Sequence, residues 1–100
     1  MDKHELLKIV SGNVKKYRSQ HGLTQEKFAE KAGISLSFCA AIESERKIPS
    51  AFTLRNMADR LDVTVDYFLY RDSEQTEIKA ISEQLAGRSA AYVDFIGRLI

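Results

Sequence analysis

The sequence has little cysteine, proline or glycine: of its 100 residues one is cysteine, one is proline and five are glycine, and tryptophan is absent. The single cysteine, Cys39, excludes an internal disulfide and a cysteine-based zinc site, which fits a reducing compartment. The glycines are scattered singly, so there is no glycine-rich phosphate loop. No apolar run is long enough to cross a membrane, and the start Met-Asp-Lys-His-Glu is too polar for a secretory signal. We therefore expect a cytoplasmic protein without a membrane partner.

Residues that carry enzymatic chemistry are also sparse. His4 and His21 have no carboxylate pair, cysteine cluster or metal-ligand spacing near them, so we expect no enzyme, no metal and no cofactor, and no small-molecule ligand is evident. The composition, with 44% hydrophobic and 29% charged residues, is that of one globular domain.

The net charge of +1 gives only weak support for a nucleic-acid partner. The distribution of charge is more informative. There are nine basic and six acidic residues up to Lys47, but six basic and eight acidic residues from Ile48 onward. The basic surplus therefore lies in the first half of the chain.

The most informative stretch runs from Leu23 to Ser44 and predicts two short helices separated by one glycine. Thr24 is a good N-cap for the first helix, and Gly33 tolerates the positive φ that ends a helix and redirects the chain. Ser35 can then cap a second helix that starts at Leu36. Two helices joined this tightly form a helix-turn-helix, which makes DNA binding the leading hypothesis.

At these residues the chain resembles the phage-repressor and Cro type of helix-turn-helix domain, also called the xenobiotic-response-element type. The resemblance covers roughly residues 10 to 69. It includes an inner stripe of Val10, Val14 and Tyr17, Arg18 before Gly22-Leu23-Thr24-Gln25, the pair Ile42-Glu43, Pro49, an inner stripe of Leu54, Met57, Ala58 and Leu61, and the closing segment from Val63 to Leu69. It implies an all-α fold with a five-helix lambda-repressor-like DNA-binding domain over residues 1–70. Beyond this domain, the spacing of apolar residues predicts a helical C-terminal extension over residues 71–100.

Three residues are candidate contacts to DNA phosphates: Gln25, Arg46 and Lys47. Gln25 would be the first residue of its helix, where free backbone N–H groups and the helix dipole favour an anion, and its amide adds a donor. The resemblance also implies phosphate contact for a glutamine at this position. Arg46 and Lys47 follow the second helix of the pair directly and are candidates to neutralise the same backbone.

The residues predicted to face the bases are Leu36, Ser37, Ala40 and Ala41. None has the paired donors and acceptors that match purine edges, so specificity would come from thymine contacts, DNA shape, water or the spacing of two half-sites. The alternative is that this small apolar face recognises a protein, as in an antitoxin or an antirepressor on a helix-turn-helix scaffold.

The resemblance implies two further features of the second helix. The first is a structural ion pair between Arg18 and Glu43, which would fix the orientation of this helix relative to the core. The resemblance also places glycine where this sequence has Glu45, so we expect another terminator, Ser44 or the loop before Pro49. Cys39 is expected on the inner face as a buried small hydrophobe.

The last thirty residues have two amphipathic segments whose apolar residues recur at helical spacing. An apolar terminus must pack on something, either its own domain or a second subunit. We favour dimerisation, because regulators of this type bind palindromic half-sites as twofold dimers, acting here as a transcriptional repressor on double-stranded DNA. The candidate dimerisation residues are Ile78, Ile81, Leu85, Tyr92, Phe95, Ile96 and Leu99.

Overall fold

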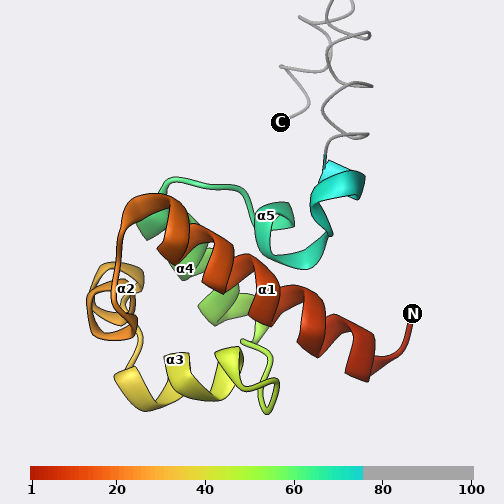
Figure 1. The fold of residues 1–100 in the computed structure, drawn as a ribbon, viewed down its shortest axis with the longest axis horizontal. Helices are drawn as coiled ribbons and strands as arrows, with labels where there is room; N and C mark the ends of the chain where they lie inside the picture. Colours follow the sequence, from red (N-terminus) through yellow and green to blue (C-terminus); the bar gives the residue numbers. More distant parts are fainter. Residues whose placement is uncertain (76–100) are drawn as a thin grey trace, which may run out of the picture.

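The computed structural model describes residues 1–75, which form an all-helical domain without strands in that range. Its helices are α1 (Lys3–His21), α2 (Gln25–Ala32), α3 (Leu36–Glu43), α4 (Ala51–Leu61) and α5 (Asp66–Leu69). The long α1 crosses the domain, with α3 and α5 packed on opposite sides of it, while α2 packs against α3 and α4 (Figure 1). The predicted all-α fold with five helices up to residue 70 is confirmed.

The chain turns helical again at residues 72–75, where the described part ends. The predicted dimerisation residues all lie outside the described residues. Within residues 1–75, no helix has the length and apolarity of a membrane span.

The helices begin and end where side-chain chemistry places the boundaries. The hydroxyl of Thr24 accepts a hydrogen bond from the Lys27 amide at 3.1 Å, and that of Ser35 accepts one from the Phe38 amide at 3.0 Å. Such caps each contribute about 1 kcal/mol to stability. Gly33 ends α2 with a φ of 76°, in the left-handed region that favours glycine. The predicted helix-turn-helix boundaries are therefore correct.

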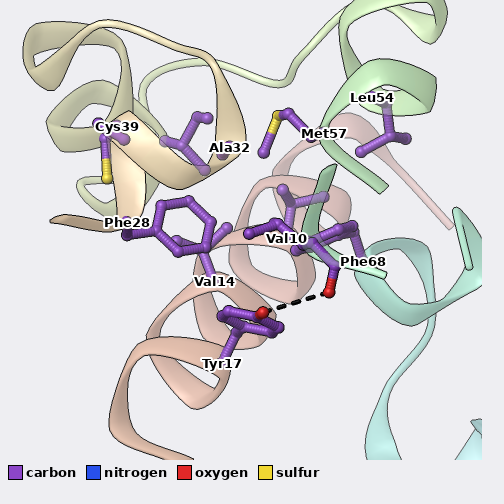
Figure 2. Packing of buried hydrophobic residues seen from close by; sticks show 12 residues of the cluster. Val10, Val14, Tyr17, Phe28, Ala32, Cys39, Leu54, Met57 and Phe68 are labelled. Carbon is purple, nitrogen blue, oxygen red and sulfur yellow. Dashed lines mark hydrogen bonds between the residues drawn. The ribbon is translucent and has the colours of Figure 1, made fainter. Parts of the chain in front are cut away.

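The hydrophobic core lies where the helices meet (Figure 2). Side chains from all five helices contribute to it, and the predicted inner stripes of α1 and α4 are buried. The Tyr17 hydroxyl donates to the Leu61 carbonyl at 3.2 Å, so the buried phenol keeps a partner. Cys39 is fully buried, as the sequence predicts. This core fixes the position of α2 and α3 relative to α1.

Helix α3 ends without the glycine that the family resemblance implies at position 45. Ser44 is its C-cap residue, one of the two terminators expected from the sequence, but Glu45 itself adopts a φ of 63°. This is the left-handed conformation that glycine adopts without steric cost. The replacement of glycine by glutamate therefore preserves the turn at the cost of backbone strain.

A buried asparagine that the sequence analysis missed attaches the end of the domain to α1. The Asn13 amide donates to the carbonyls of Phe68 and Tyr70, at 3.0 and 2.9 Å. Lys16 forms an ion pair with Asp72 just beyond. An asparagine on a helical inner face is a weak signal in a sequence, because only the tertiary structure shows which carbonyls it satisfies.

Candidate nucleic-acid interface

A two-point ion pair attaches α3 to α1. The Arg18 Nε and Nη2 atoms donate to the two Glu43 carboxylate oxygens, each at 2.7 Å, and Arg18 Nη1 also donates to the Leu23 carbonyl at 3.0 Å. The Glu43 side chain is only 5% exposed and that of Arg18 24%. The Ser11 hydroxyl donates to the Glu43 carbonyl at 2.7 Å and adds a second link between the two helices. Arg18 and Glu43 therefore form the predicted ion pair.

Glu43 stays ionised in spite of its burial. Burial alone would raise its pKa, but hydrogen bonding from Arg18 and Gln25 outweighs this, and the pKa lies below its ordinary value. The negative charge is thus matched by Arg18 inside the domain. The Glu43 carboxylate therefore presents no uncompensated charge at the surface of α3.

Cys39 lies one helical turn before Glu43, and its thiol donates to the Glu43 carboxylate at 3.5 Å. Burial, together with the negative charge of Glu43, raises the pKa of the Cys39 thiol to about 11. The thiol is therefore protonated at neutral pH and has a structural role in packing.

The outer face of α3 contains Leu36, Ala40 and Ser44, which are four apart in the sequence, and Ser37 beside Leu36. Leu36 is 49% exposed, Ser37 and Ser44 are exposed, and Ala40 is half-buried. These positions share one side of the helix because four residues span slightly more than one turn. The outer face, defined here as Leu36, Ser37, Ala40 and Ser44, is the surface of α3 available to a partner.

Ala41, the remaining residue predicted to face the bases, differs from the other three in its burial. Its side chain is buried, with only 6% exposed. The loop after α3 turns back onto it, since the amides of Arg46 and Lys47 both donate to the Ala41 carbonyl, at 2.9 and 3.3 Å. Ser44, four residues after Ala40, is exposed on the same side as Leu36 and Ala40.

The same loop places two cations at the end of the outer face. Arg46 and Lys47 are both exposed. The Arg46 Nε donates to the Ser44 hydroxyl at 2.8 Å, while that hydroxyl donates to the Ala41 carbonyl at 3.2 Å. The two backbone bonds to Ala41 and the Ser44 hydroxyl thus hold Arg46 and Lys47 beside the C-terminal end of α3.

Gln25 is the first residue of α2 and is half-buried. Its side-chain amide contributes to lowering the pKa of the Glu43 carboxylate. Gln25 therefore connects the start of α2 to the Arg18–Glu43 pair, a link that the sequence did not predict.

The sequence and structure are similar to those of known regulators. A helix-turn-helix family model matches residues 14–68. The chain is 40% identical over 67 residues to the uncharacterized HTH-type transcriptional regulator YqaE of Bacillus subtilis, which covers 67% of this chain and 58% of that protein. It is 39% identical over 70 residues to the immunity repressor protein of Bacillus phage phi105, covering 70% of this chain and 46% of the repressor. The chain thus spans about half the length of these two relatives.

Two solved structures have a similar fold at 23% sequence identity. The hypothetical transcription factor NHTF from Neisseria aligns with a TM-score of 0.66, over 78% of this chain and 90% of that one. The clp gene regulator ClgR from Corynebacterium glutamicum aligns with a TM-score of 0.58, over 81% of this chain and 86% of that one. The helical architecture is therefore shared at low sequence identity.

Proposed function

Because the chain belongs to the helix-turn-helix family, we propose that it is a sequence-specific DNA-binding regulator of transcription that represses by occupying an operator. The observation that carries the proposal is the outer face of α3, which is exposed, fixed to α1 through Arg18 and Glu43, and bordered by two exposed cations. A helix held in this way at the surface suits insertion into the major groove. The phage immunity repressor among the relatives supports repression as the mode of action.

In the proposed complex, the outer face of α3 lies against the base edges and three side chains bind the phosphates. Arg46 and Lys47 bind the DNA backbone beside the C-terminal end of α3. The Gln25 amide and the first backbone N–H groups of α2 bind the DNA backbone at the start of α2, where the helix dipole favours an anion. Each neutralised phosphate makes the logarithm of the binding constant fall with the logarithm of salt by a slope of about 0.9.

The proposal includes a twofold dimer on palindromic half-sites. Its support is the apolar periodicity of the sequence beyond residue 75, since exposed apolar side chains at that density are unfavourable in water. Light scattering on the purified full chain tests this part, and a molar mass of one chain at every concentration would contradict it.

The DNA-binding proposal is tested by selecting duplexes from a random library with the full chain and measuring their affinity at several salt concentrations. Enrichment of a common sequence, with affinity that falls steeply as salt rises, supports a sequence-specific regulator. Failure to enrich any sequence would contradict it. Salt-insensitive capture of a protein through the outer face of α3 would instead favour an antitoxin-like or antirepressor-like interaction module.

A further inference from the structure

We infer that the protein reads its operator through the methyl groups of thymine, and that Leu36 is the residue that contacts them. The inference rests on the proposed function and specifies how its binding surface distinguishes one base from another. It assigns a specificity-determining role to a leucine, a residue type that cannot hydrogen-bond to a base.

Leu36 is one of four exposed large apolar side chains in residues 1–75, with Met1, Phe52 and Tyr70, and it is the one of the four that lies on α3. It is 49% exposed and lies at the N-terminal end of α3, directly after the Ser35 N-cap. Cys39 and Ile42 on the inner side of the same helix are completely buried, whereas Leu36 is exposed to solvent. The N-terminal residues of a recognition helix are the ones that reach base edges.

The rest of the outer face offers little hydrogen bonding to compete with this contact. Ala40 has no polar side-chain atom. The Ser44 hydroxyl is already engaged, donating to the Ala41 carbonyl and accepting from Arg46. Only the Ser37 hydroxyl, 3.5 Å from that of Ser35, remains to exchange a hydrogen bond with a base.

The major groove contains one apolar group that such a surface can recognise. Thymine carries a C5 methyl group at the groove edge, and the other three bases carry only hydrogen-bonding groups or hydrogen there. Contact between an isobutyl side chain and this methyl removes apolar area from water without leaving a polar group unpaired. A paired-donor readout of guanine or adenine would need an arginine, lysine, asparagine or glutamine, and the outer face has none.

The test uses the duplex enriched from the random library, in which each thymine is replaced in turn by deoxyuridine. This change deletes the methyl group and leaves every hydrogen-bonding group in place. At the thymines that Leu36 contacts, we expect binding to the full chain to weaken about fourfold per methyl, the factor that corresponds to one buried methyl group. Replacement of the other thymines should leave the affinity unchanged.

The variant Leu36→Ala identifies the residue responsible. It should bind the thymine duplex more weakly and lose the difference between thymine and deoxyuridine, whereas Ser37→Ala should retain that difference. Because Leu36 is half exposed, the Ala variant should keep the wild-type helical circular dichroism spectrum. An enriched duplex that binds equally well with deoxyuridine at every position would overturn the inference and leave the proposed function intact. An equal methyl effect in wild type and Leu36→Ala would also overturn it, and failure to enrich any duplex would overturn both proposals.

Discussion

The Arg18 guanidinium holds the Glu43 carboxylate through two hydrogen bonds of 2.7 Å, and this contact connects the long helix α1 to the C-terminal end of α3. The pair orients α3 and keeps its acidic residue neutralised inside the domain. The stability of the domain and the presentation of the outer face of α3 therefore depend on the same contact.

Arg18→Ala should lower the free energy of unfolding by about 3 kcal/mol, because it leaves the buried Glu43 carboxylate without its main partner. Urea denaturation near neutral pH measures the change. The matched control is Arg55→Ala, which removes an exposed ion pair with Asp59 and should cost less than about 0.5 kcal/mol. Equal losses in the two variants would show that the Arg18 pair contributes no more than a surface contact.

The same carboxylate predicts acid sensitivity. The pKa of Glu43 is lowered in the folded state, so the pair stabilises the fold above the ordinary glutamate pKa of 4.5, and this contribution is lost as pH falls through the lowered value. Glu43→Gln should therefore be less stable than wild type near neutral pH, and the difference should shrink in acid. The other carboxylates titrate in both proteins, so the comparison isolates Glu43. A difference in unfolding free energy that stays constant down to about pH 3 would contradict the lowered pKa.

Cys39 should react slowly with thiol reagents. Its pKa of about 11 leaves very little thiolate near neutral pH, and the side chain is fully buried. Because it is the only cysteine, alkylation by iodoacetamide followed by mass spectrometry reports on this residue alone. We expect the native protein to be modified at least about 100-fold more slowly than the protein in guanidinium. Similar rates in the two conditions would mean that the thiol is exposed and activated.

Glu45→Gly should raise the free energy of unfolding by about 0.5 to 1 kcal/mol, because glycine adopts the observed φ of 63° without steric cost. Asp62, with a φ of 57°, is the matched control. Aspartate tolerates the left-handed region better than glutamate, so Asp62→Gly should gain less. Thermal and urea unfolding measure both variants. A loss of stability in Glu45→Gly would show that the glutamate side chain makes a contact that outweighs the strain.

Much of the fold could be predicted from the sequence because its determinants are local. Thr24, Gly33 and Ser35 mark helix ends through their own backbone and side-chain chemistry, and helical spacing predicted the buried stripes. The burial of Ala41 was not predicted, because helical spacing places it beside Ser37, which lies four residues earlier and is exposed. The link from Gln25 to Glu43 was missed because neither residue type indicates which partner it will meet.

The most direct test of the account is the salt dependence of binding to the enriched duplex by wild type, Arg46→Gln and Lys47→Gln. If both cations neutralise phosphates, each variant should lower the slope of log affinity against log salt by about 0.9 and weaken binding to all sequences alike. Lys8→Gln is the control, because Lys8 lines a groove between α1 and residues 71–72 and should leave the slope unchanged. Slopes for Arg46→Gln and Lys47→Gln equal to that of wild type would contradict the proposed DNA interface.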